Sequence, residues 1–173
     1  MNILSRFKLI KTFIFDMDGV LTDGSLTIEP NGNWIRRMNI KDGYAIQLAV
    51  KSGYKVAVIS GSESTPVLDR LRKLGVNDVF MKVNEKENFL KEYMLSNKIL
   101  NEETLFMGDD IPDYGALKIV GLPCCPGDAA VEIKQICSYI SAVRGGYGCV
   151  RDVIEKVLKL NDHWPLNTTV AAT

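Results

Sequence analysis

Short apolar segments alternate with longer amphipathic segments along most of the chain. The apolar segments are rich in β-branched and aromatic residues, as buried strands are, whereas the longer segments carry apolar residues three and four positions apart, as helices do. This pattern predicts strands at 12–15, 54–60, 78–81, 104–107 and 139–142, and helices at 42–52, 66–74, 85–97 and 150–160, with a further helix opening near Pro112.

Turn-forming residues mark the ends of several of these elements. Residues 26–38 are expected to form a β-hairpin, because Asn31-Gly32 is a preferred pair for a tight turn between two strands. Gly53 and Gly75 each follow an expected helix, where glycine favours termination.

Regular alternation of strand and helix is typical of a parallel sheet covered by helices on both faces. Right-handed crossovers make such a sheet doubly wound, so the expected fold class is α/β and Rossmann-like, with the hairpin as a flap. Ligands of these folds bind beyond the carboxyl ends of the strands. Asp16 and Asp18 follow one expected strand, Ser60 and Gly61 follow a second, and Asp109 follows a third. The sequence therefore predicts one polar site at that edge.

The composition is that of a globular domain, with 46% hydrophobic and 24% charged residues in a chain of 173. We expect one domain over residues 1–160 and a polar tail, 161–173, that is flexible or docks on a neighbouring subunit. Basic and acidic residues both number 21, and there is no basic stripe. Both features argue against nucleic acid as a partner, because binding to a phosphate backbone needs a local basic excess.

Targeting signals are also missing from the pattern. Arg6, Lys8 and Lys11 interrupt the apolar N-terminal segment, so we do not expect a secretory signal. No apolar run approaches the roughly 20 residues of a membrane helix, so no membrane partner is expected. The four cysteines match no zinc spacing, and we expect free thiols in a cytoplasmic protein. His163 is the only histidine, so catalysis would rest on carboxylates, lysine or hydroxyls.

The segment FDMDGVLTDG, residues 15–24, carries two aspartates directly after an apolar strand. Asp16 and Asp18 should point into the same site, and Gly19 allows the tight turn behind them. Two close carboxylates repel one another unless a cation or a shared proton compensates. Mg²⁺ fits, because it prefers oxygen ligands and needs only one or two carboxylates besides water and phosphate. A helix cap or an Asx-turn is the alternative interpretation of this segment.

Three further motifs are weak signals singly but together indicate a phosphate site. The hydroxyl and backbone N–H groups of Ser60-Gly61 can hold phosphate oxygens, although such a pair is often only a turn. Lys86 can offset negative charge in the site, although a lysine at a helix start is often only solvated. Helix capping beside Pro112 explains one acidic residue after the strand at 104–107, but three are present: Asp109, Asp110 and Asp113.

The order of these motifs, DxDG, SG, a lysine and GDDxxD, resembles the haloacid dehalogenase superfamily of phosphotransferases over nearly the whole chain. The resemblance implies a Mg²⁺-dependent phosphomonoester hydrolase that passes through an aspartyl-phosphate. Asp16 would be the nucleophile, and Asp18 the general acid and base, which also offers the metal its backbone carbonyl. The implied sets are Asp16, Asp18 and Asp109 for Mg²⁺; Ser60, Gly61 and Lys86 for phosphate; Asp16, Asp18 and Lys86 for catalysis; and Asp110 and Asp113 as supports behind the metal ligands.

The gaps between the motifs are too short for a cap domain. An uncapped site is open to water unless another subunit covers it, so we expect an oligomer. Segments 39–50, 121–134 and 145–158 resemble the 3-deoxy-D-manno-octulosonate 8-phosphate phosphatases of lipopolysaccharide biosynthesis, which implies a homotetramer with shared active sites and a small sugar phosphate as substrate. By that similarity the substrate contacts would be Asn39, Ile40, Lys41, Asp42, Gly43 and Arg70.

Two departures from this family keep alternatives open. Ser62 and Gln47 stand where the family commonly has arginine, so contacts to an anionic leaving group would be weaker or come from elsewhere; Arg36, Lys41, Lys73 and Arg144 are candidates. A phosphatase for a 3-deoxy-nonulosonate 9-phosphate or another sugar phosphate is one alternative. A vestigial oligomerisation module is another, and the intact motif residues argue against it. Arg70 could also form only a surface ion pair.

Overall fold

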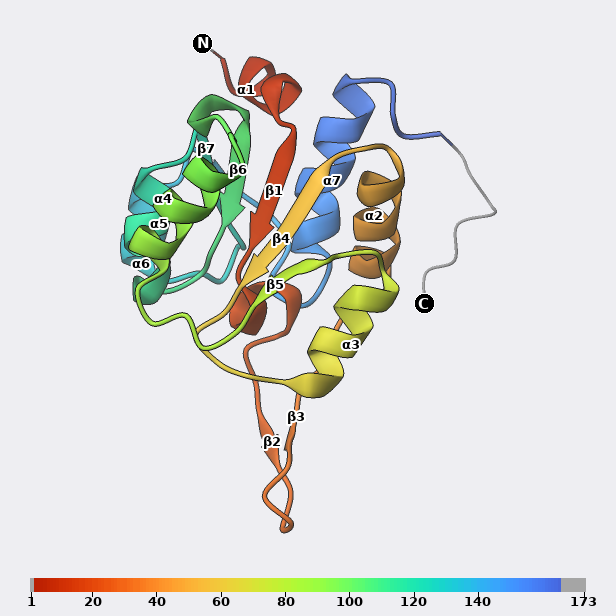
Figure 1. The fold of residues 1–173 in the computed structure, drawn as a ribbon, viewed down its shortest axis with the longest axis vertical. Coiled ribbons are helices and arrows are strands. Elements are labelled where there is room, and N and C mark those ends of the chain that lie inside the picture. The colour runs from red at the N-terminus through yellow and green to blue at the C-terminus, as the bar shows by residue number, and fades with distance from the viewer. Residues whose placement is uncertain (1, 166–173) are drawn as a thin grey trace.

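The computed structural model describes residues 2–165, and its centre is a six-stranded sheet (Figure 1). All neighbouring strands of this sheet run parallel. The strands are β1 (Thr12–Phe15), β4 (Lys55–Ile59), β5 (Asp78–Phe80), β6 (Thr104–Met107), β7 (Leu122–Cys125) and β8 (Tyr139–Ile140). Their order across the sheet is β5-β4-β1-β6-β7-β8. The chain leaves β1 toward one edge and later returns to β1's other side, which is the doubly wound arrangement.

Helices cover both faces of the sheet. They are α1 (Ile3–Leu9), α2 (Ile40–Lys51), α3 (Thr65–Lys73), α4 (Lys86–Ser96), α5 (Tyr114–Lys118), α6 (Val131–Ile136) and α7 (Cys149–Leu160). The first three and α7 pack on one face, and α4, α5 and α6 pack on the other (Figure 1). Successive strand residues alternate between the two cores, so Phe13 and Phe15 face the α7 side while Ile14 faces the α4 side.

The α/β, doubly wound fold class is confirmed, and most elements lie where the pattern predicts them. The predicted strands at 12–15 and 104–107 coincide with β1 and β6. Helix α2 begins two residues earlier than predicted, because the Asn39 side chain accepts a hydrogen bond from the Lys41 N–H at 2.8 Å and caps the helix there. The pattern missed α1, β7 and α6.

The predicted hairpin is confirmed as two short antiparallel strands, β2 (Thr27–Ile28) and β3 (Trp34–Ile35). It projects from the carboxyl-end edge of the sheet (Figure 1). Gly32 has a φ of 85°, a left-handed conformation that glycine adopts without strain, and its N–H donates to the Glu29 carbonyl. The hairpin is therefore a flap beside the site, held at its base by a bridge between Thr22 and Met38.

The first residues after α7 pack against the body of the same chain. His163 Nδ1 lies 2.9 Å from the Tyr54 hydroxyl, and the Trp164 ring packs edge-on against the Tyr44 ring. The Arg151 guanidinium lies 5.3 Å from the centre of the Trp164 ring. The prediction of a flexible or neighbour-docked tail also covers residues 166–173, which lie outside the described residues. Within residues 2–165, no helix has the length and apolarity needed to cross a bilayer.

Candidate active site

The carboxyl ends of β1, β4 and β6 meet at one cavity of about 460 Å³. It lies where the strand order reverses around β1, the position at which doubly wound sheets bind ligands. The structure thus brings together residues that are up to 97 positions apart in sequence, from 16 to 113. The predicted residues that line this cavity are Asp16, Asp18, Ser60, Gly61, Lys86, Asp109, Asp110 and Asp113.

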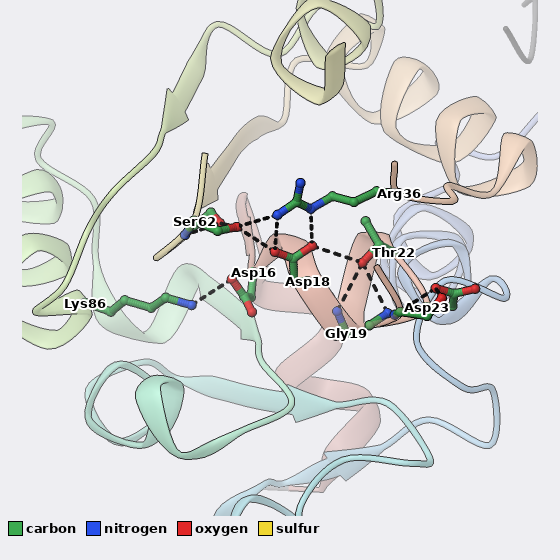
Figure 2. A network of polar contacts seen from close by, with 11 residues as sticks. Asp16, Asp18, Gly19, Thr22, Asp23, Arg36, Ser62 and Lys86 are labelled. Carbon is green, nitrogen blue, oxygen red and sulfur yellow. Dashed lines mark hydrogen bonds and ion pairs between the residues drawn. The ribbon is translucent and has the colours of Figure 1, made fainter. Parts of the chain in front are cut away.

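Lys86 forms two buried ion pairs at the bottom of the cavity. Its ammonium donates to Asp16 Oδ1 at 2.7 Å and to Asp113 Oδ1 at 2.6 Å, and its side chain is only 4% exposed. Burial alone would lower the pKa of Lys86, but Asp113 and Asp16 raise the pKa above its usual value. The Lys86 ammonium is therefore stabilised in its charged form, and it holds the Asp16 carboxylate in one orientation (Figure 2).

Asp16, Asp109 and Asp113 each place an oxygen within 4.8 Å of the others. Burial, and then repulsion from Asp113, raises the pKa of Asp16 to about 7 despite the ion pair with Lys86. Burial, and then repulsion from Asp16 and Asp113, raises the pKa of Asp109 to about 8. Asp109 Oδ1 is buried without a hydrogen-bond partner among the described residues. An under-compensated cluster of carboxylates with a free oxygen fits a divalent cation.

Asp113 also serves the geometry of this cluster. Its Oδ2 accepts from the Asp109 N–H at 3.0 Å, while its Oδ1 accepts from Lys86. Asp113 thereby ties the loop after β6 to the lysine of α4. Asp110 is different: its Oδ1 accepts from the Ile111 N–H at 2.8 Å and caps the short helical turn at Ile111–Asp113.

The raised pKa values give a prediction about metal-free protein. Between the usual aspartate value of 3.8 and about 7 to 8, the folded state retains protons that the unfolded chain has released. The stability of metal-free protein should therefore fall as pH rises through this window. A bound divalent cation compensates the carboxylates and should raise the melting temperature more at about pH 8 than at about pH 5. Thermal melts in Mg²⁺ and in chelator at both pH values measure this, and an equal Mg²⁺ effect at both would contradict a cluster of titrating ligands.

Asp18 lies beside the cluster and is held by other partners (Figure 2). Arg36 of the hairpin donates from Nε to Asp18 Oδ1 at 2.7 Å and from Nη2 to Oδ2 at 3.1 Å. The Ser62 hydroxyl donates to Oδ2 at 2.6 Å, and the Thr22 hydroxyl donates to Oδ1 at 3.3 Å. Burial raises the pKa of Asp18, but the bonds from Arg36 and Ser62 outweigh it and lower the pKa below its usual value.

The loop that carries both aspartates is closely packed against two other segments. Gly19 has a φ of 90°, and a Cβ at this position would overlap the Asp109 carboxylate. A Cβ at Gly145 would overlap the Gly19 carbonyl oxygen, and one at Gly146 would overlap the backbone of Thr22 and Asp23. Sequence reasoning missed Gly145 and Gly146, although the paired glycines before α7 were a signal of close backbone approach.

The loop after β4 brings two hydroxyls into the cavity. Ser60 is 1% exposed, and its N–H donates to the Phe80 carbonyl at 2.9 Å. Its Oγ accepts from the Ser62 N–H at 3.1 Å and lies 3.3 Å from the Ser62 Oγ. Gly61 lies at the cavity between them and has room for a side chain, since a Cβ there would be 3.7 Å from the Val83 carbonyl oxygen.

The predicted substrate contacts at the start of α2 are only partly near the cavity. Asp42 is 2% exposed and its Oδ1 accepts from the Arg151 N–H at 2.6 Å, so it caps α7 instead of facing the cavity. Burial raises the pKa of Asp42 to about 6. Gly43 beside it is also buried, and Asn39 caps its own helix. The structure therefore does not bring Asp42, Gly43 or Asn39 to the reacting groups, whereas Lys41 is exposed.

Ile40 and Arg70 instead line a second cavity of about 770 Å³, between the hairpin and α3. Nε and Nη2 of Arg70 are buried and have no hydrogen-bond partner among the described residues. The alternative interpretation, in which Arg70 forms only a surface ion pair, is not supported, because no ion pair of Arg70 is found among the described residues. Arg36 also lines this cavity and contacts Asp18, so it lies at the border between the second cavity and the first.

Comparison with known proteins agrees with this geometry. Residues 72–149 match the family of haloacid dehalogenase-like hydrolases. A 3-deoxy-D-manno-octulosonate 8-phosphate phosphatase from Haemophilus influenzae is 32% identical over 154 residues, covering 89% of this chain and 86% of that protein. The chain belongs to the haloacid dehalogenase-like hydrolases. In Escherichia coli K12, a phosphatase of the same name is 30% identical over 157 residues, with 91% and 84% covered.

Solved structures of haloacid dehalogenase-like hydrolases share the whole fold. The 3-deoxy-D-manno-octulosonate 8-phosphate phosphatase from Yersinia pestis superposes with a TM-score of 0.90 at 28% identity, covering 93% of this chain and 87% of that one. The phosphatase of that name from Moraxella catarrhalis gives a TM-score of 0.89 at 28% identity, with 92% of both chains covered. The Moraxella structure is a complex with a magnesium ion, a phosphate ion and the KDO molecule.

Proposed function

We propose that this haloacid dehalogenase-like phosphatase hydrolyses 3-deoxy-D-manno-octulosonate 8-phosphate, with Mg²⁺ as cofactor and an aspartyl-phosphate on Asp16 as intermediate. The observation that carries the chemistry is the meeting of three carboxylates and a buried lysine at the switch point of the sheet. The relatives that cover most of the chain support the choice of substrate, and one of them was solved with Mg²⁺, phosphate and the sugar acid.

Asp16 would attack the phosphorus atom with the oxygen that does not accept from Lys86. A bond forms between this carboxylate oxygen and phosphorus, and the bond from phosphorus to the sugar oxygen breaks. Lys86 fixes the orientation of Asp16 and places positive charge next to the phosphoryl oxygens. Asp16, Asp109 and the Asp18 backbone carbonyl would hold Mg²⁺, which when bound offsets the negative charge of the carboxylates and the phosphoryl group.

Because the bonds from Arg36 and Ser62 hold Asp18 ionised, its carboxylate would first have to take up a proton from solvent. Asp18 would then pass that proton to the departing sugar oxygen and take one from the water that hydrolyses the aspartyl-phosphate. Its position between Asp16 and the hairpin suits a group that faces the leaving side of the phosphate (Figure 2). Ser60 and Gly61, at the end of β4, would hold phosphoryl oxygens through the hydroxyl and backbone N–H groups.

The sugar acid would occupy the second cavity. Its volume of about 770 Å³ lies within the range of small-molecule sites. Nε and Nη2 of Arg70, which have no partner among residues 2–165, would bind the carboxylate of the sugar acid, which an arginine fork suits. Related phosphatases commonly have arginine at the position of Gln47. Gln47 is not among the residues lining either cavity, whereas Arg70 lines the second one, so Arg70 is the cation that can reach the sugar acid.

Oligomerisation would complete the site, as a homotetramer with shared active sites. The hairpin and the start of α2 expose four large apolar side chains: Ile28 (67%), Trp34 (54%), Ile35 (50%) and Ile40 (62%). Exposed apolar side chains gathered on a projecting hairpin and the helix start beside it support a contact between proteins there. Light scattering of the full chain tests this, and a fully active monomer would contradict it.

We also propose a cytoplasmic location, supported by four cysteines that are all free thiols.

A panel of phosphorylated sugar acids tests the substrate. We expect the highest kcat/KM for the eight-carbon 3-deoxy sugar acid phosphate, by about tenfold or more over the nine-carbon analogue, because one well-filled pocket contact discriminates by roughly that factor. Turnover should require Mg²⁺ and be lost in chelator. A higher kcat/KM for a nine-carbon acid would move the assignment to that substrate, and absence of all turnover would favour an assembly module.

A further inference from the structure

Arg36 of the hairpin lies where the two cavities meet. Its Nε and Nη2 donate to the two oxygens of Asp18 at 2.7 Å and 3.1 Å, and Nη2 also donates to the Ser62 hydroxyl at 3.2 Å. The third nitrogen, Nη1, is turned away from Asp18 (Figure 2) and has no hydrogen-bond partner among residues 2–165. Since Arg36 also lines the second cavity, one guanidinium belongs to both sites.

The contact with Arg36 leaves Asp18 no free oxygen for a substrate. Each carboxylate oxygen accepts from Arg36. Each also accepts from a hydroxyl, that of Thr22 on Oδ1 at 3.3 Å and that of Ser62 on Oδ2 at 2.6 Å. A two-point contact with a guanidinium is among the strongest that a carboxylate makes, and it persists when a hydroxyl rotates away. Asp18 therefore cannot face a departing sugar oxygen until Arg36 leaves it, so this contact is a resting state.

Arg36 can leave Asp18 only for another anion. Its side chain is 2% exposed, and a buried charge without a partner is strongly unfavourable. Asp18 depends less on the contact, because its side chain is 33% exposed and the hydroxyls of Ser62 and Thr22 still donate to it. The supply of a second anion to Arg36 therefore decides whether the resting contact opens.

The second cavity offers a place for such an anion. Arg70 lines this cavity, and its buried Nε and Nη2 have no partner among the described residues. Of the two acidic residues that line it, Glu63 is paired with Lys82 at 2.6 Å, and Glu29 accepts from a neighbouring side chain of the hairpin. A carboxylate that enters the cavity thus meets two guanidiniums, those of Arg36 and Arg70.

We propose that a carboxylated substrate opens the resting contact: its carboxylate takes the place of Asp18 on Arg36, and Asp18 is released to the leaving oxygen. No covalent bond changes in this exchange, because the guanidinium only passes from one carboxylate to another. A phosphate ester without a carboxylate enters the first cavity but leaves Arg36 on Asp18. Arg36 is therefore the residue that makes turnover specific for sugar acids. The inference rests on the proposed function, namely the sugar-acid substrate and the acid role of Asp18.

Two esters of primary alcohols test the exchange: 3-deoxy-D-manno-octulosonate 8-phosphate carries a carboxylate, and ribose 5-phosphate lacks one. We expect Arg36→Met to lower kcat/KM for the sugar acid phosphate by about tenfold or more, the usual effect of losing a charged hydrogen bond. The same variant should raise kcat/KM for ribose 5-phosphate by about threefold or more, because Asp18 is then free to assist the leaving oxygen. Arg36→Lys should shift both values less, since an ammonium makes no two-point contact. Arg37→Gln, at the exposed neighbouring position, is the matched control and should change neither.

The other outcomes separate this exchange from simpler roles. A loss for both substrates would mean that Arg36 only maintains the site, and an unchanged value for ribose 5-phosphate would mean that it only binds the sugar acid. Either result would overturn the proposal. Melting temperatures check the fold, and Arg36→Lys carries the comparison if Arg36→Met does not fold. If the wild type shows no preference for the sugar acid phosphate, the proposed substrate fails instead, while the rise for ribose 5-phosphate still tests the release of Asp18.

Discussion

Replacing Asp16 by asparagine should abolish turnover and leave the fold intact. The amide has no carboxylate to form the acyl-phosphate, and loss of a nucleophile costs on the order of 10⁴-fold or more in rate. The fold should tolerate the change, because the amide oxygen can still accept a hydrogen bond from Lys86, which in the wild type donates to Asp16 at 2.7 Å. At about pH 8 the metal-free variant should be at least as stable as the wild type, since one member of a repelling cluster has lost its charge.

The measurements are steady-state turnover, a thermal melt in chelator, and intact mass after rapid mixing with substrate. A phosphoryl adduct should form on the wild type and be missing from Asp16→Asn. Asp23→Asn is the matched control, because Asp23 belongs to the same loop but accepts from Ser25 at the surface. Substantial activity in Asp16→Asn, or an adduct at another residue, would refute the nucleophile assignment.

Replacing Lys86 by methionine should cost both activity and stability. The side chain is buried between Asp16 and Asp113, so its removal leaves two buried carboxylates without their cation. Breaking a buried pair by deleting one partner typically costs about 3–5 kcal/mol of unfolding free energy. Loss of one positioned charge in an active site typically lowers kcat by about 10²–10³-fold. The stability deficit should be smaller at about pH 5 than at about pH 8, because protonation of the carboxylates relieves their repulsion.

Lys91→Met on the same helix is the control for this experiment. Lys91 pairs with Glu87 one turn away, and both side chains are about half exposed, at 54% and 45%. Such a pair contributes about 0.5 kcal/mol or less. Denaturant unfolding and steady-state kinetics of both variants separate the two positions. If Lys86→Met behaved like Lys91→Met in both assays, Lys86 would not be the cation of the site.

The residues at the carboxyl ends of the strands could be predicted from the sequence, because each of them directly follows its own strand. Asp16 and Asp109 directly follow strands whose apolar pattern is strong, β1 and β6, and parallel neighbours place their carboxyl ends together. β7 was missed because Pro123 interrupts its apolar run, and proline argues against an inner strand. In the sheet Pro123 pairs with Phe106 and still accepts, through its carbonyl, a hydrogen bond from the Ser138 N–H.

Side-chain directions set by distant segments could not be predicted. Asp42 was expected to face the substrate, but its carboxylate caps a helix whose bonding residue, Arg151, is 109 positions away. Similarly, the approach of Arg36 to Asp18 depends on how the hairpin folds back over the loop. Neither orientation can be seen in the hydrophobic periodicity of the sequence, because each depends on packing between elements and not on the element itself.

The close approach of Gly145 to Gly19 has a consequence for synthesis of the protein on the ribosome. The loop that carries Asp16 and Asp18 is made early in translation, but the backbone that packs against its Gly19 is made 126 residues later. Until that turn leaves the exit tunnel, the loop lacks the backbone contact of Gly145, and α7, which packs on the same face of the sheet, is also missing. The nascent chain therefore carries every motif residue from 16 to 113 before it possesses a finished catalytic centre.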